Sequence, residues 1–272
     1  MSGRPPAGGR AGGEAGPGAG SATGSDGPEA PARPHEPRGV GQSIRTANGR
    51  WSFGGAVADT FESHIERSVP GYREGHELVA RLSDWFLYDG AVAIEIGCST
   101  GALTRRLAEW NEGRRARIVG LEIEPRMAEA ARRHCEGLPA VEIREGDALV
   151  EDLEPADLVV SYYTMQFVRP ARRQALFDKI YAALNWGGAF VMFEKVRAPD
   201  ARFQDILTAL YSDFKLDQGF DEAEIVHKAR SLKGVLEPFS TQGNLDLLDR
   251  AGFRDRMTVF KRLSFEGFLA IK

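Results

Sequence analysis

Three acidic residues of this 272-residue chain each lie at the end of a short apolar run, where a strand would finish. Glu95 lies in "AIEIGCSTG", Glu122 closes "ARIVGLE", and Asp147 follows "VEIRE" within "EGDAL". After Glu95, Gly97 and Gly101 mark a tight turn that leads into a helical pattern. In open parallel sheets the carboxyl ends of the strands form one ligand-binding edge. The acids are therefore predicted to meet at one site.

Their spacing favours a cationic ligand over a phosphate-bearing one. The run from Glu95 to Gly101 contains neither G-x-G-x-x-G nor the Gly-Lys-Ser/Thr of a P-loop. Glu95 would repel a pyrophosphate, whereas it would attract an ammonium or sulfonium group. Glu122 is placed to accept hydrogen bonds from ribose hydroxyls, and Asp147 lies where an adenine edge is expected. Together they predict S-adenosylmethionine (SAM) as the cofactor.

The chain beyond residue 45 predicts the elements that must position these acids. Strand-like runs are expected at 91–96, 116–122, 141–145, 156–162, 188–195, 257–263 and 265–272, and helices at 101–110, 125–136, 170–184 and 200–214. Alternating strands and helices are typical of a parallel sheet, but Ser264 alone separates the last two strands, which must pair antiparallel. We expect an α/β, Rossmann-like class I methyltransferase fold. Its mostly parallel seven-stranded sheet has an antiparallel last strand and a helical lid.

The amino-acid composition distinguishes an N-terminal tail from a single domain that follows it. Residues 1–42 contain 12 of the 31 glycines and 7 of the 14 prolines, with almost no large apolar side chain. We therefore expect residues 1–44 to be disordered and residues 45–272 to form the SAM-dependent domain. No run could span a bilayer, and a net charge of −4 disfavours nucleic acid as a partner. The expectations are a cytoplasmic protein, a small-molecule acceptor and no metal, because the five histidines lack ligand spacing.

Longer stretches carry a resemblance to a known family. They are "FGGAVADTFESHIERSVPGY" (53–72), "EIGCSTGALT", "YTMQFVRPARRQALFDKIYAALNWGGAFVMFEK" (163–195), "DFKLDQGFDEAEI" (213–225), "ARSL" (229–232) and "AGF" (251–253). In these stretches the chain resembles the bacterial carboxy-S-adenosylmethionine synthase family. Members of that family use SAM and prephenate to make a carboxylated sulfonium that serves wobble-uridine modification in tRNA. The resemblance also implies a homodimer.

The resemblance assigns roles to individual residues. Tyr72 would cover the cofactor, and Arg230 would hold a carboxylate. The methionine part would lie against Gly97, Cys98 and Ser99. Ribose and adenine would lie against Glu122, Ile123, Asp147 and Ala148. The predicted cofactor-binding residues are Tyr72, Glu95, Gly97, Cys98, Ser99, Gly101, Glu122, Ile123, Asp147, Ala148 and Tyr162.

Departures from the family favour a different reaction. Tyr162 stands where the family has an asparagine facing the transferred group, and the acidic and amide side chains after Arg230 are lost in "SLKGVLEPF". The favoured function is SAM-dependent methylation of a small molecule, at a carbon or oxygen of an aromatic or carboxylate-bearing metabolite. Carboxy-SAM synthesis from prephenate is the alternative. A non-catalytic SAM-binding protein or a methyltransferase acting on a macromolecule is a third possibility.

Aromatic and titratable residues complete the predicted site. The predicted substrate-binding residues are Trp51, Phe53, Tyr163, Tyr211 and Arg230, within an aromatic lining that also includes Phe61, Tyr72, Tyr162 and Phe193. If the acceptor must lose a proton, the candidate catalytic bases are His64, Tyr163, His227 and Glu194. The two histidines are preferred because imidazole titrates near neutral pH.

Overall fold

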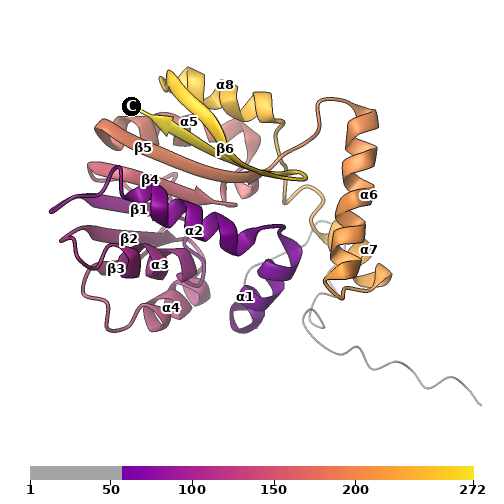
Figure 1. Ribbon diagram of the computed structural model, residues 1–272, viewed down its shortest axis with the longest axis horizontal. Coiled ribbons are helices and arrows are strands. Elements are labelled where there is room, and N and C mark those ends of the chain that lie inside the picture. Colours follow the sequence, from indigo (N-terminus) through magenta and orange to yellow (C-terminus); the bar gives the residue numbers. More distant parts are fainter. Residues whose placement is uncertain (1–56) are drawn as a thin grey trace, which may run out of the picture. The chain divides into compact units, whose positions relative to one another are not determined.

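One seven-stranded sheet forms the centre of the computed structural model, which describes residues 57–272 (Figure 1). The strand order is β3-β2-β1-β4-β5-β7-β6. The strands are β1 (Val92–Ile96), β2 (Arg117–Glu122), β3 (Val141–Glu145), β4 (Ala156–Tyr162), β5 (Leu184–Lys195), β6 (Asp255–Arg262) and β7 (Phe265–Ile271). All pairings from β3 to β5 are parallel, and β7 is antiparallel to both β5 and β6. The predicted sheet, with its antiparallel last strand, is confirmed.

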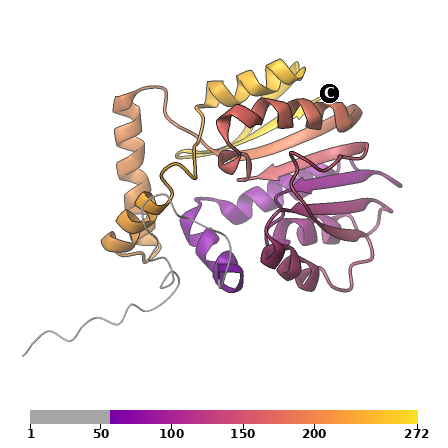
Figure 2. The same ribbon diagram turned by 180° about the vertical axis from the view of Figure 1, so that it is seen from behind.

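Helices cover both faces of the sheet (Figures 1 and 2). Helices α2 (Tyr72–Ser83), α3 (Ala102–Trp110) and α4 (Pro125–His134) lie on one face, and α5 (Pro170–Ala183) and α8 (Thr241–Ala251) lie on the other. Side chains alternate between the faces along each strand. In β5, Val191 and Phe193 join the core beneath α2 and α3, whereas Phe190 and Met192 join the core beneath α5 and α8.

Three further helices stand beyond the carboxyl ends of the parallel strands (Figure 1). They are α1 (Val57–Ser68), α6 (Ala201–Asp217) and α7 (Glu222–Ser231). The N-terminus of α6 is capped by Asp200, which accepts from the N–H of Phe203, and α7 begins with a capping box formed by Asp221 and Glu224. These helices form the predicted lid. None of the helices described is long and apolar enough to cross a membrane.

Most predicted element boundaries lie within two residues of those in the structure, and the larger differences are in β5 and α6. Strand β5 begins at Leu184 rather than 188, because Leu184 pairs with Ala156 of β4 before a register shift. Helix α6 continues to Asp217, past the predicted end at 214, which brings Lys215 into a helix. The predicted tail, residues 1–44, and the predicted substrate residues Trp51 and Phe53 lie outside the described residues.

Candidate cofactor and acceptor site

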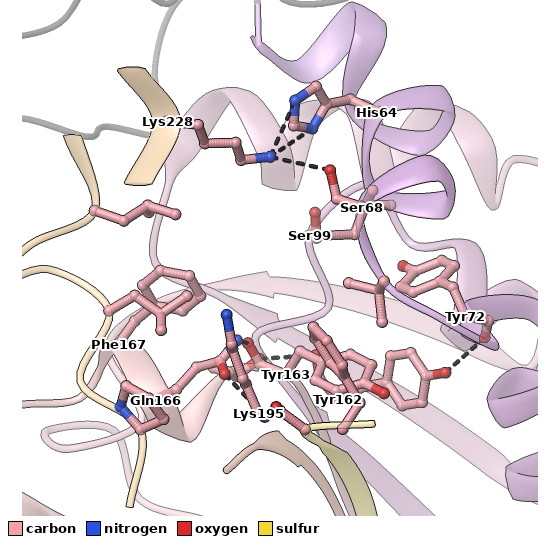
Figure 3. Close-up of a pocket in the computed structure, with 18 of the residues that line it drawn as sticks. His64, Ser68, Tyr72, Ser99, Tyr162, Tyr163, Gln166, Phe167, Lys195 and Lys228 are labelled. Atoms are coloured by element: carbon pink, nitrogen blue, oxygen red, sulfur yellow. Dashed lines mark hydrogen bonds between the residues drawn. The ribbon is translucent and has the colours of Figure 1, made fainter. Parts of the chain in front are cut away.

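A cavity of about 550 Å³ lies between the carboxyl ends of the strands and the lid helices. This volume falls within the range of small-molecule sites. Predicted residues that line the cavity are Phe61, His64, Tyr72, Glu95, Gly97, Cys98, Ser99, Glu122, Ile123, Tyr162, Tyr163 and Tyr211. Figure 3 shows several of them converging from α1, β4 and the turn after β1. Predicted residues outside the lining are Gly101, Asp147, Ala148, Phe193, Glu194, His227 and Arg230.

The two glycines after β1 are required by the packing of the chain itself. Gly97 has a φ of +73°, and a Cβ atom there would lie 2.4 Å from Cγ2 of Thr164. Gly101 has a φ of +81°, and a Cβ atom would lie 3.1 Å from the Cα of Ala131 in α4. Only Gly97 also lines the cavity. The two glycines are therefore explained by the tight strand–helix turn and by the packing of α4, without a contact to a ligand.

Replacing Gly101 by alanine should destabilise the fold. A non-glycine residue in the left-handed region costs roughly 1–2 kcal/mol, and here the new methyl group would also press on Ala131. The matched control is Gly137→Ala, where φ is +83° but nothing lies within 4 Å of the added Cβ atom. Urea unfolding should show a larger loss for Gly101→Ala than for the control. Equal losses would show that the contact with α4 is unimportant.

Buried carboxyl groups form one end of the cavity. Glu122 is 7% exposed, and its carboxylate accepts from the N–H groups of Ser99 at 2.8 Å and Glu124 at 2.9 Å. Glu95 is 3% exposed, hydrogen-bonds the hydroxyl of Thr104, and has a pKa that burial raises to about 8. Burial also raises the pKa of Glu122.

The acidic end suits a cationic ligand that carries a ribose. Glu62 adds a third carboxyl group, whose pKa is likewise raised by burial. Within residues 57–272, no lysine or arginine forms an ion pair with Glu62, Glu95 or Glu122. A bound sulfonium or ammonium group would supply the missing positive charge. Ile123, which is 63% exposed, offers an apolar surface beside these acids.

Asp147 lies in the turn that follows β3, beside the acidic end of the cavity. Its carboxylate accepts from the N–H of Leu149 at 2.9 Å within its own turn. The preceding residue, Gly146, donates its N–H to the carbonyl of Glu122 at 2.8 Å, so the turn lies beside the acidic end without lining the cavity. The predicted contact of Asp147 and Ala148 with adenine stays a prediction.

The side chain of Tyr162 is held in place by a hydrogen bond to the first residue of α2. Its hydroxyl donates to the carbonyl of Tyr72 at 2.6 Å (Figure 3). The close approach requires Gly75, where a Cβ atom would lie 2.1 Å from this hydroxyl. Phe193 packs behind Tyr162 with a centroid separation of 4.8 Å and does not reach the cavity. His76, which was not among the predicted site residues, packs against Tyr72 and Tyr162 and also lines the cavity.

The four candidate bases separate into two groups. His64 and Tyr163 line the cavity, whereas His227 is exposed on α7 and Glu194 lies outside the lining. Burial and nearby cations lower the pKa of His64 to about 3, so its imidazole is neutral at physiological pH. Burial raises the pKa of the Tyr163 hydroxyl well above its ordinary value, so this group is a hydrogen-bond donor rather than a base. Because side chains alternate along a strand, Glu194 lies on the face of β5 opposite to Phe193, where Arg173 is its charged neighbour.

The opposite end of the cavity is basic, and its residues were not predicted from the sequence. Lys195 of β5, Lys215 of α6 and Lys228 of α7 all line the cavity, whereas Arg230 is exposed on α7. Lys195 could have been predicted, because it ends a parallel strand just as Glu122 does. Lys215 could have been found from its spacing of four residues from Tyr211, had the helix been extended past residue 214.

The strand order, the antiparallel β7 and a ligand cavity at the carboxyl edge with acids at the ends of β1 and β2 define a class I SAM-dependent methyltransferase fold. A family described as "Methyltransferase domain" matches residues 93–188. The chain is 36% identical over 227 residues to carboxy-S-adenosyl-L-methionine synthase of Salmonella paratyphi B, covering 82% of this chain and 92% of that protein. It belongs to the carboxy-S-adenosyl-L-methionine synthase family. It is therefore an enzyme that transfers a one-carbon group and uses SAM.

Solved structures agree on the fold. The apo form of the SAM-dependent methyltransferase SibL superposes with a TM-score of 0.58 at 16% identity, covering 79% of this chain and 58% of that one. A putative O-methyltransferase from Nostoc punctiforme also gives 0.58, at 18% identity and with coverage of 80% and 60%. Identities this low support the architecture alone.

Within the part of the chain that the structure describes, no group of three His, Cys, Asp or Glu side chains could hold a metal ion.

Proposed function

We propose that this enzyme transfers the methyl group of SAM to a carbon or oxygen of a small aromatic or carboxylate-bearing metabolite. The observation that carries the proposal is that acidic residues and tyrosines line one cavity of about 550 Å³ beneath helices α1, α6 and α7. A cavity covered in this way suits a small acceptor better than a nucleic acid or a protein segment. A cytoplasmic location fits the same proposal.

The residues of the chain would act mainly by holding and aligning the reactants. SAM, when bound, would supply the methyl group of its sulfonium centre. After the transfer, the sulfur would remain as a neutral thioether. Glu95 and Glu122 would hold the cationic and ribose parts at the acidic end. Tyr72 and Tyr163 would exclude water and stabilise a cation through their ring faces, by roughly 0.5–2 kcal/mol. Good alignment of two reactants can itself lower a barrier by about 7–11 kcal/mol.

Of the candidate bases for an acceptor that must lose a proton, His64 lines the cavity, but its pKa of about 3 makes it a weak base, so the site suits an acceptor that needs little deprotonation. The His64 imidazole is neutral, lines the cavity and lies within hydrogen-bond distance of Lys228, with Nζ 3.0 Å from Nε2 (Figure 3). The Tyr163 hydroxyl would donate a hydrogen bond to the acceptor, since its raised pKa keeps the proton in place.

Carboxy-SAM synthesis from prephenate is the second candidate. The 36% identity, extending over 92% of the Salmonella synthase, favours it. Tyr162 weighs against it. This bulky side chain is fixed by its hydrogen bond to Tyr72, and it stands where other members of the family have an asparagine.

Mass spectrometry distinguishes the two candidates. Purified enzyme is incubated with SAM and a panel of aromatic and carboxylate-bearing acceptors, or with SAM and prephenate. Methyl transfer should yield S-adenosylhomocysteine together with an acceptor that is heavier by one methylene unit. A nucleotide heavier than SAM by a carboxyl group, formed only with prephenate, would establish the second candidate instead. If SAM does not bind to the enzyme at all, both are wrong.

We also propose that the enzyme is a homodimer that pairs through α6. Phe203, Ile206 and Leu210 lie three and four residues apart on this helix and are each about half exposed. An apolar stripe of this kind normally contacts another surface. Leu210→Glu should halve the molar mass measured by light scattering, whereas Asp213→Ala on the same helix should not change it. A wild-type protein that is monomeric at micromolar concentration contradicts this proposal.

A further inference from the structure

Arg173 of α5 is a buried arginine that lies outside the lining of the cavity. Only 1% of it is exposed. Its guanidinium donates to three backbone carbonyls: that of Val168 at 2.8 Å through Nε, and those of Gln166 at 3.2 Å and Glu237 at 2.6 Å through Nη2. Its Cζ also lies 4.3 Å from the ring centroid of Phe239. Burying a charge is costly, so a buried guanidinium spent on carbonyls of other segments requires an explanation.

The three carbonyls belong to two segments that both line the cavity. Two of them lie in the β4 turn (residues 163–168), which follows β4, and the third lies in the lid-return segment (residues 232–240), which connects α7 to α8. The two segments also contact each other, because the N–H of Glu237 donates to the carbonyl of Gln166 at 3.0 Å. Arg173 therefore joins the turn after β4 to the chain that leaves the lid helices.

The β4 turn begins with a strained tyrosine. Tyr163 has a φ of +59°, a conformation that is unfavourable for a residue with a side chain and persists only where the surrounding structure enforces it. Tyr163 lines the cavity, and its buried hydroxyl has no hydrogen-bond partner within residues 57–272. A buried donor without a partner also costs free energy. Tyr163 therefore keeps a hydrogen-bond donor available for a ligand of the cavity.

Gln166 holds Tyr163 in this conformation. The Gln166 side chain is buried, donates from Nε2 to the carbonyl of Tyr163 at 3.0 Å and accepts from the N–H of Lys195 at 3.1 Å (Figure 3). On its other side, Tyr163 donates its N–H to the carbonyl of Phe193 at 2.8 Å. The strained residue is thus fixed at both ends, by β5 and by Gln166. Gln166 is held in turn through its own carbonyl, which accepts from Arg173.

A buried carboxyl group supports the same turn from β5. Glu194 is 2% exposed, and the backbone N–H groups of Met165 and Gln166 act on its carboxyl group as hydrogen-bond donors. Arg173 is its charged neighbour. Arg173 therefore holds carbonyl groups of the β4 turn, and Glu194 holds N–H groups of the same turn. Two buried residues of opposite charge fix both kinds of backbone group.

We propose that Arg173 is a positioning residue of this enzyme. Through Gln166 it keeps Tyr163 in its strained conformation, and through Glu237 it fixes the lid-return segment against the β4 turn. Arg173 lies outside the lining, so it acts only through residues that face the cavity. The inference rests on the proposed function in one respect, because the Tyr163 hydroxyl would contact the acceptor. Loss of Arg173 should therefore slow group transfer more than it weakens binding of SAM, whose acidic end is built on β1 and β2.

Hydrogen–deuterium exchange of the full-length enzyme tests the connection between the two segments. Lysine keeps the positive charge, but its ammonium group cannot span three carbonyls as the planar guanidinium does. In Arg173→Lys, amide exchange should rise by about tenfold or more in the β4 turn and the lid-return segment together, and stay unchanged in β1 and β2. Arg172→Lys, at the exposed neighbouring position, is the matched control and should change neither segment. A rise in one segment only, or an even rise over the whole sheet, would overturn the proposal.

Fluorine NMR of enzyme labelled with 3-fluorotyrosine reports on Tyr163 itself. The chain has six tyrosines, and Tyr163→Phe assigns the resonance by its loss. Arg173→Lys should shift or split this resonance and leave that of Tyr88, which precedes β1, unchanged. If Arg173→Lys does not fold, Gln166→Met, which removes the bond to the Tyr163 carbonyl, should give the same change. An unaltered Tyr163 resonance in a folded variant contradicts the proposal.

Kinetics separate this inference from the proposed function. With the acceptor that mass spectrometry identifies, Arg173→Lys should lower kcat by about tenfold or more, whereas KM and calorimetric affinity for SAM should stay nearly unchanged. The same substitution made in Tyr163→Phe should have little further effect, because Arg173 acts through Tyr163. Additive losses in the double variant would show that Arg173 does not act in this way. If no transfer is detected, the proposed function fails, whereas the exchange and fluorine measurements still decide whether Arg173 positions the turn.

Discussion

Between pH 6 and pH 8, the affinity of the enzyme for SAM should rise by about 50-fold through Glu95 alone, by about ninefold up to pH 7 and about fivefold from pH 7 to pH 8. Burial raises the pKa of Glu95 from 4.5 to about 8, so the carboxyl group is protonated at neutral pH when no cation is present. A bound cation favours the carboxylate, so binding must release this proton. The affinity should level off above pH 8, where the proton has already been lost. Calorimetry in two buffers at pH 7 measures the protons released.

Glu95→Gln isolates this contribution. The amide keeps the size of the side chain but cannot ionise, so the number of protons released should fall by close to one and the pH dependence should become shallower. Glu62 and Glu122, whose pKa values are also raised, remain in the variant and account for any dependence that is left. His64 and His76 have pKa values of about 3 and 4, so both stay neutral in this range. An unchanged proton count in Glu95→Gln would show that Glu95 does not face the cofactor.

The same pKa predicts how the cofactor-free protein responds to pH. A carboxyl group whose folded pKa is raised is more easily ionised in the unfolded chain. Its contribution to stability therefore falls as pH rises from about 4.5 towards 8. The melting temperature without cofactor should decline less over this range in Glu95→Gln than in the wild type.

Glu122→Gln should weaken SAM binding by about 10- to 100-fold, because a hydrogen bond to a charged group contributes about 1.5–3 kcal/mol. The Glu122 carboxylate already accepts from two backbone N–H groups, and its remaining lone pairs are available to ribose hydroxyls. The amide variant preserves the shape of the site but offers only one acceptor oxygen. Calorimetry with SAM gives the change in affinity.

Glu145→Gln provides the matched control. Glu145 pairs with Glu122 in the register of β2 and β3, carries the same side chain and is exposed outside the cavity. Its substitution should leave SAM affinity unchanged. Equal losses in the two variants would indicate a general effect of surface charge, and no loss in Glu122→Gln would remove Glu122 from the cofactor site.

Local sequence patterns were sufficient to predict the sheet and the acidic end of the cavity. Strand and helix periods are properties of short segments, and parallel strands necessarily bring their carboxyl ends to one edge. Glu95 and Glu122 could therefore be placed near each other without knowledge of the tertiary structure. Because side chains alternate along β5, the sequence also predicts that Lys195 and Glu194 lie on opposite faces of the sheet. Which of the two faces the cavity follows only once the orientation of β5 is known.

The tertiary structure alone decided which residues of the lid face the cavity. Helix α6 has apolar residues on more than one side, including the exposed Phe203 and Leu210, so its pattern does not reveal its inner face. The orientation is instead fixed by long-range contacts, such as the bond from Tyr211 to the carbonyl of Ser68. This packing turns Lys215 and Lys228 inward and leaves Arg230 exposed. The sequence by itself placed Glu95 and Glu122 at one end of the cavity, because both lie at strand termini. Only the folded lid decided that Glu62, Lys215 and Lys228 face the cavity, because that depends on how separate helices pack.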